Sequence, residues 1–241
     1  SENLFKGLSP WMQKLPGGLI HVNVVGCALF AAISGSSAAT VATVGKMSIP
    51  ELRKRNYPEK ILLGSLAGSG TLGLLIPPSI ILIIYGVAVQ ESIAKLFIAG
   101  IIPGIMIALI FMSYVIIWSL INKKSMPKIL EEYSFFEKIK RSKQLLPVII
   151  LILAVIGSIY TGIATATEAA SLGVVGALIL SYFQKSLTLK TFKSSLLGAT
   201  KTSCMIAFIL AGSTFLSLAM GFTGLPRNLA LWIQNLSLIH I

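Results

Sequence analysis

Two clusters of small polar residues lie inside apolar segments, and their residue types and spacing could support chemistry. The first cluster is Ser34-Gly35-Ser36-Ser37, with Thr40 three residues later. The second cluster runs from Gly64-Ser65 through Gly68-Ser69-Gly70-Thr71-Leu72-Gly73, and Leu74-Leu75-Ile76-Pro77-Pro78-Ser79 follows it. Hydroxyl groups and freed backbone carbonyls are hard oxygen ligands, and these suit a hard cation such as Na⁺. Neither cluster contains a carboxylate, so a site built from them would hold its ion weakly.

The second cluster predicts an interrupted helix. Glycine is permissive about φ, proline removes a backbone donor, and the residue before a proline is driven out of the α region. A helix running from Ile61 should therefore break near Gly70–Ile76. Because proline suits the first turn of a helix, we expect the chain to restart its helix at Pro77 or Pro78.

The first cluster lies in the middle of an apolar segment, residues 17–45, which is too short for two complete membrane crossings. Lysines flank this segment on both sides, so the chain should enter and leave on one side as a re-entrant hairpin. Small-residue helix packing is the alternative explanation for either cluster alone. A hairpin tip facing a helix break would instead build a midplane ion site. We favour a Na⁺ site of Ser34, Gly35, Ser36, Ser37, Gly70, Thr71 and Gly73, with Thr40, Pro77, Pro78 and Ser79 near the substrate.

A third polar group is Thr165-Ala-Thr167-Glu168, which contains an acidic residue far from any basic loop. An intramembrane carboxylate is a functional candidate by default. The spacing Thr165-x-x-Glu168 is also that of a capping box, which would start a helix over residues 169–183. We favour capping and keep a direct transport role as the alternative.

No catalytic set is visible, and we predict neither an enzyme nor a cofactor. His21 and His240 lack plausible partners, while Cys27 and Cys204 lie in apolar segments without metal-ligand spacing. The net charge of +12 would suggest nucleic acid in a soluble protein. Here the basic residues occupy short stretches between apolar runs, as in the cytoplasmic loops of membrane proteins. The predicted surroundings are therefore a lipid bilayer, without nucleic acid.

Composition indicates an all-α, multi-pass membrane protein. Of 241 residues, 55% are hydrophobic and 12% are charged, against about 25% charged in soluble domains. The basic stretches 46–60, 122–144 and 184–202 should all be cytoplasmic, and capping boxes at Ser48 and Ser134 should start short surface helices within the first two. We predict one transmembrane domain over 1–241, comprising a re-entrant hairpin over 17–45, a broken transmembrane helix over 61–90, one crossing over 96–121, a cytoplasmic loop over 122–144, two crossings over 145–183 and further transmembrane segments over 203–241.

These residues resemble the large membrane subunit of the tripartite ATP-independent periplasmic (TRAP) transporters. The matching stretches are Gly17-Gly18, residues 33–40, residues 70–79, Pro103-Gly104 and residues 162–169, where Ala166 replaces the proline usual in the family. The resemblance covers the whole chain in order. Since the family has a second, inverted half, and since the sequence starts without Met and stops within an apolar stretch, we expect a fragment of a longer permease.

The resemblance implies an elevator-type secondary transporter of the bacterial cytoplasmic membrane, with Na⁺ as the coupling ion. Its implied partners are a small Q-type membrane subunit, separate or fused, and a periplasmic substrate-binding protein. The implied substrates are small organic anions of the C4-dicarboxylate or sialic-acid type. The alternatives are a Na⁺-coupled carboxylate transporter that needs no binding protein, and a channel or structural membrane subunit.

Overall fold

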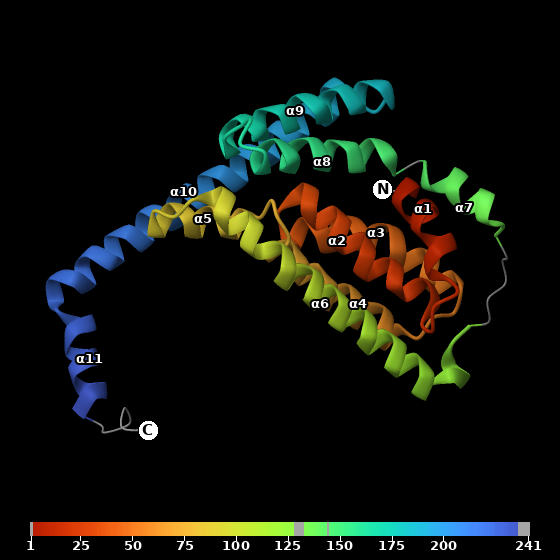
Figure 1. The fold of residues 1–241 in the computed structure, drawn as a ribbon, viewed down its shortest axis with the longest axis horizontal. Helices are drawn as coiled ribbons and strands as arrows, with labels where there is room; N and C mark the ends of the chain where they lie inside the picture. The colour runs from red at the N-terminus through yellow and green to blue at the C-terminus, as the bar shows by residue number, and fades with distance from the viewer. Residues whose placement is uncertain (1, 128–132, 144, 236–241) are drawn as a thin grey trace. The chain divides into compact units, whose positions relative to one another are not determined.

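The computed structural model describes residues 2–127, 133–143 and 145–235, and all regular structure in these ranges is helical. Figure 1 shows the helices in chain order. The chain divides into two compact units, Ser1–Phe183 and Gln184–Ile241, and each is described by itself. The helices of the first unit are α1 (Glu2–Met12), α2 (His21–Ser34), α3 (Ser37–Lys54), α4 (Glu59–Gly70), α5 (Ile80–Val89), α6 (Ile93–Ile121), α7 (Phe135–Ser142), α8 (Leu146–Tyr160) and α9 (Ala166–Phe183).

The centre of the first unit is a hairpin, α2 and α3, packed against α4. One apolar cluster joins the three helices through Cys27, Val44 and Leu66. Another joins the same helices through Val22, Leu52 and Leu62. These side chains are at most 3% exposed, so the hairpin and α4 share a continuous core.

The second arm of the hairpin is longer than the sequence predicted. Helix α3 runs without a break to Lys54, so the expected separate surface helix starting at Ser48 is wrong. Val44, Ser48 and Leu52 recur every four residues and are fully buried, which places them on one face of α3. Burial of this face against α2 and α4 outweighs the local capping signal and continues the helix through Pro50.

The helix that follows is interrupted in the stretch where the glycines and prolines predict it. Helix α4 ends at Gly70, a 3₁₀ turn covers Thr71–Leu74, and α5 begins only at Ile80. The expected restart at Pro77 or Pro78 is therefore corrected to Ile80. The backbone of Ser79 is extended (φ −119°, ψ 132°), so both prolines belong to the connecting turn.

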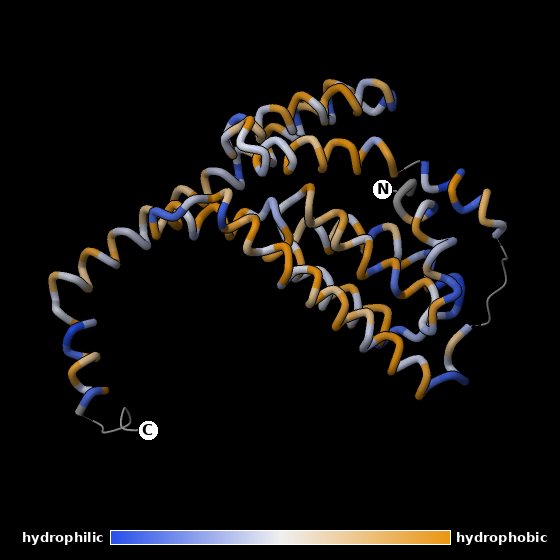
Figure 2. Tube along the Cα trace, viewed as in Figure 1, coloured by the Kyte–Doolittle hydropathy of each residue, from blue (hydrophilic) through white to orange (hydrophobic). Residues whose placement is uncertain are grey.

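Helices long and apolar enough to cross a membrane, among the described residues, are α6, α9 and α10 (Leu189–Thr223). Figure 2 shows how densely apolar residues occupy α6. Helices α2 and α5 are apolar but shorter. Large side chains on α6, such as Ile102 and Ile121, are more than 70% exposed, which suits contact with lipid. The chain is an all-α membrane protein.

The remaining helices of the first unit, α7, α8 and α9, lie in the segments 122–144 and 145–183. Ser134 and Glu137 make the expected capping box, and α7 begins directly after it at Phe135. Residues 128–132 and 144 of the predicted loop lie outside the described residues. The predicted pair of segments over 145–183 consists of α8 and α9, and α9 begins at Ala166 rather than at Ala169.

The second unit contains α10 and α11 (Leu225–Asn235). The basic stretch over 184–202 was expected to be a loop, but α10 already begins at Leu189 and includes three of its lysines. Thr188 and Thr191 form a capping box there, and lysine is a good helix former, so the charges did not mark a break. The last six residues of the predicted 203–241 segment lie outside the described residues.

Candidate functional site

The tip of the hairpin is a tight turn held by hydroxyl groups. Gly35 follows α2 with φ 59°, and Ser36 caps α3 by accepting a hydrogen bond from the N–H of Ala39 (3.5 Å). The hydroxyls of Ser34 and Thr40 are hydrogen-bonded across the turn (2.9 Å). Thr40 also donates to the carbonyl of Ser36 (2.7 Å). The predicted first cluster is therefore one compact structure.

This tip packs directly against the helix break. The N–H of Ile80 donates to the carbonyl of Gly35 (3.2 Å). A Cβ atom placed on Gly35 would lie 2.8 Å from the Pro78 carbonyl oxygen, and one on Gly73 would lie 2.9 Å from the Ser37 nitrogen. Both contacts are too close for any residue larger than glycine. The two clusters thus lie against each other, as the sequence led us to expect.

Other residues of the second cluster hold the break itself. Ser79 is buried and donates to the carbonyl of Leu74 (2.7 Å). Thr71 is exposed and donates to the carbonyl of Gly68 (2.7 Å). Gly70 packs against Val41 of α3, and Pro77 lies next to Gly100 of α6. These contacts make the break a fixed part of the core.

Ser37 carries the one buried hydroxyl of the tip that has no hydrogen-bond partner among the described residues. It is the first residue of α3, and its backbone lies against the break at Gly73. Residues 34–40 and 70–80 contain no charged side chain. In the described part of the chain, no group of three His, Cys, Asp or Glu residues could hold a metal. The arrangement therefore offers neutral oxygens, which suit an alkali cation rather than a transition metal.

The third predicted group lies at the turn between α8 and α9. The N–H of Thr165 donates to Glu168 Oε2 (2.8 Å), and the N–H of Glu168 donates to Thr165 Oγ1 (3.3 Å). The Thr167 carbonyl accepts a hydrogen bond from the Ser171 hydroxyl (3.3 Å). The two reciprocal bonds between Thr165 and Glu168 are those of a helix cap, and they satisfy backbone N–H groups that would otherwise lack partners.

One buried polar residue was missed by the sequence reasoning. Asn23 of α2 is fully buried, and its amide nitrogen donates to the Leu62 carbonyl (3.2 Å) and to the Ser65 hydroxyl (3.0 Å) of α4. Asn23 therefore fastens the hairpin to the helix that carries the break. An asparagine inside the apolar run His21–Val25 is the signal that could have revealed it.

The chain is similar to known transport proteins along nearly its whole length. Residues 2–241 match the family described as "Tripartite ATP-independent periplasmic transporter, DctM component". The C4-dicarboxylate TRAP transporter large permease protein DctM of Pseudomonas aeruginosa is 35% identical over 224 residues, which cover 92% of this chain and 52% of that protein. The protein of the same name from Rhodobacter capsulatus is 36% identical over 237 residues, which cover 92% of this chain and 53% of that protein.

A relative with a different named substrate matches similarly. The sialic acid TRAP transporter permease protein SiaT of Haemophilus influenzae is 35% identical over 217 residues, which cover 89% of this chain and 35% of that protein. The chain spans about half the length of the DctM relatives. Because the family match covers nearly the whole chain, this chain belongs to the DctM family of large permease subunits of TRAP transporters.

Proposed function

We propose that this chain is part of the large permease subunit of a transporter that takes up small organic acids by using a Na⁺ gradient. The observation that carries the proposal is the contact between the hairpin tip and the helix break. The backbone of Ser37 takes part in this contact, and its buried hydroxyl has no partner among the described residues. Such pairs of helix ends form the ion and substrate sites of many secondary transporters.

The proposed Na⁺ site uses oxygen atoms of the tip and the break. The last carbonyls of α2 and α4 lack partners further along their own helices, so some can face an ion. The Ser37 hydroxyl would add a ligand without losing an existing hydrogen bond. The N-terminal ends of α3 and α5 carry partial positive charge, which would favour an anionic substrate near Thr40, Pro77, Pro78 and Ser79.

The remaining parts of the proposal concern the whole protein. We expect a small Q-type membrane subunit, separate or fused, and a periplasmic binding protein that delivers the substrate, in a bacterial cytoplasmic membrane. The substrates named for the relatives support small organic acids as the class. An elevator movement would carry the hairpin and the broken helix as one body, and their shared buried core supports this.

The test compares two serines of α3 in the full-length transporter. Ser37 and Ser48 both have buried hydroxyls without a partner, but only Ser37 lies at the tip. The two serines are eleven positions apart, which corresponds to about three helical turns and about 16 Å. Uptake into proteoliposomes, with the binding protein and labelled substrate, is measured as a function of Na⁺ concentration for Ser37→Ala and Ser48→Ala.

We expect Ser37→Ala to raise the Na⁺ concentration for half-maximal uptake by about 10-fold, which corresponds to ~1.4 kcal/mol. Ser48→Ala should leave it unchanged. Unchanged Na⁺ dependence in Ser37→Ala would remove this hydroxyl from the site. Uptake that is independent of Na⁺ in the wild type would overturn the coupling ion itself. Ser36→Ala is a poorer test, because it also removes the cap of α3.

A further inference from the structure

A pocket of about 450 Å³ lies at the opposite end of α2 from the hairpin tip. Its walls come from the turn between α1 and α2, from Tyr57 in the loop after α3, and from the C-terminal end of α6. Helix α2 has 14 residues and is about 21 Å long, so the pocket is well separated from the proposed Na⁺ site. The proposed function leaves it without a role.

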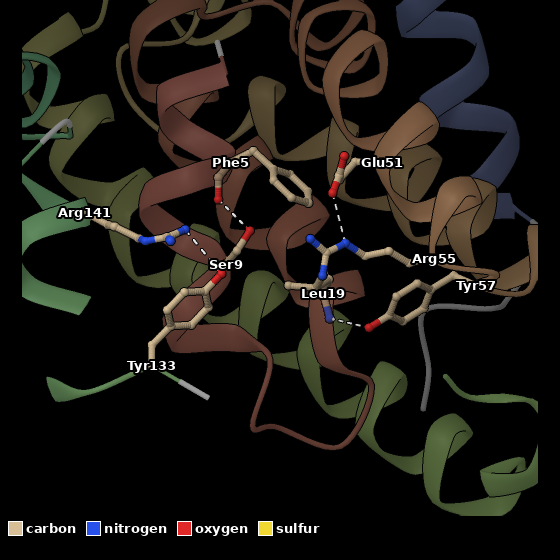
Figure 3. A network of polar contacts seen from close by, with 8 residues as sticks. All are labelled: Phe5, Ser9, Leu19, Glu51, Arg55, Tyr57, Tyr133 and Arg141. Carbon is tan, nitrogen blue, oxygen red and sulfur yellow. Dashed lines mark hydrogen bonds and ion pairs between the residues drawn. The ribbon is translucent and has the colours of Figure 1, made fainter. Parts of the chain in front are cut away.

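The polar lining of this pocket favours an anion. Lys14 and Lys123 contribute to the wall from two different segments, and none of the described residues that line it is acidic. The hydroxyl oxygen of Tyr57 accepts a hydrogen bond from the N–H of Leu19 (3.0 Å), as Figure 3 shows. This bond leaves the hydroxyl proton available to a ligand. A tyrosine hydroxyl is protonated at neutral pH, and burial raises the pKa of Tyr57 further.

The rest of the lining is apolar, and its position relates it to the membrane. Leu15, Leu120 and Met126 line the pocket together with the two lysines. Lys123 follows α6 within two residues of its end, so it would lie at the bilayer surface if α6 crosses the membrane. Leu120 and Ile117 are each about half exposed and extend from the pocket along α6.

We propose that this pocket binds an anionic phospholipid, with the phosphate between Lys14 and Lys123 and an acyl chain along Leu120 and Ile117 of α6. Basic pockets among transmembrane helices are suited to such headgroups. A soluble organic acid would use the lysines but would leave the apolar strip without a partner. A lipid satisfies both parts of the surface at once. The inference depends on α6 crossing the bilayer and does not depend on Na⁺ coupling.

The experiment measures phosphatidylglycerol binding to the full-length transporter in a neutral detergent, by titration with native mass spectrometry. Detergent removes the surface potential of a bilayer, so only local contacts remain. The test variant is Lys14→Gln/Lys123→Gln. All four lysines are exposed, and the matched control, Lys60→Gln/Lys124→Gln, removes the same charge from two that do not line the pocket. A parallel titration uses inorganic phosphate at constant ionic strength.

A hydrogen bond from a charged lysine to a phosphate is stronger than one between neutral groups, so the test variant should bind phosphatidylglycerol at least about ten-fold more weakly. The control should change binding by less than about three-fold, because exposed charges that do not contact the ligand contribute little. An equal loss of phosphatidylglycerol affinity in the test variant and the control would overturn the assignment of the binding site to this pocket. Inorganic phosphate that binds as tightly as the lipid, with the same dependence on Lys14 and Lys123, would overturn the lipid assignment.

Discussion

Asn23 and Ser48 are both fully buried polar residues, yet we predict opposite effects when each is replaced by alanine. Asn23 lies eleven residues before the end of α2, and Ser48 lies eleven residues after the start of α3. They therefore occupy matching levels of the hairpin. The amide nitrogen of Asn23 donates two hydrogen bonds to α4, whereas the Ser48 hydroxyl has no partner among the described residues.

The expected magnitudes follow from these contacts. Asn23→Ala removes both bonds and leaves the Leu62 carbonyl without one of its donors. It also removes the buried Oδ1 atom of Asn23, which has no partner among the described residues, so part of the loss is offset. Hydrogen bonds between membrane helices contribute on average ~0.6 and at most ~1.7 kcal/mol each, so the loss should be roughly 1–3 kcal/mol. Ser48→Ala removes a buried hydroxyl that makes no hydrogen bond, together with its desolvation cost. The free energy of unfolding should stay the same or rise by up to about 1 kcal/mol.

The assay is reversible unfolding of the full-length protein in mixed micelles, which gives the free energy of unfolding of each variant. Ser65→Ala and the double variant complete a cycle with Asn23→Ala, because residues that share a hydrogen bond should show non-additive losses. An equal destabilisation by Ser48→Ala would refute the reasoning, since it would mean that the Ser48 hydroxyl has a partner. An Asn23→Ala variant as stable as the wild type would show that the bonds to α4 contribute nothing.

Three further predictions concern the tip, the cap and the topology. Gly73→Ala should destabilise the protein by about 1–3 kcal/mol in the same unfolding assay, because its Cβ would meet the Ser37 backbone, while Gly64→Ala, which has open space around it, should be neutral. Thr165→Ala removes a cap of α9 and should lower the free energy of unfolding by about 1 kcal/mol. Glu168→Gln can still cap α9 and should retain uptake. A loss of uptake in Glu168→Gln would favour a transport role for this carboxylate. Single cysteines at Asn56 and Ser125, in a protein lacking Cys27 and Cys204, should both react with a membrane-impermeant reagent from the cytoplasmic side; labelling from outside would refute the predicted orientation.

Local sequence signals predicted the features that neighbouring residues control. The glycines and prolines between Gly70 and Pro78 remove backbone donors and restrict φ, so a helix break there needs no distant contact. The capping boxes at Ser134 and Thr165 act within one helical turn. The shortage of charged residues indicated a membrane protein, because so apolar a chain cannot cover itself in water.

The same signals failed where distant contacts compete with them. Ser48 has the spacing of a capping box, but the face it shares with Val44 and Leu52 is buried against two other helices, and this burial keeps α3 continuous. The restart of α5 at Ile80 likewise depends on long-range contact, since the N–H of Ile80 is bonded to the carbonyl of Gly35.

The sequence by itself therefore determined that this is a helical membrane protein. It also determined that the helix starting near Ile61 is interrupted, and which small polar residues lie in apolar segments. Only the tertiary structure decided that the tip at Gly35 meets the break at Gly73, that Asn23 joins α2 to α4, and that Lys14 and Lys123 line one pocket. The physical reason is that propensity and capping act over a few residues. Contacts between residues far apart in sequence depend instead on how the apolar faces of whole helices pack together.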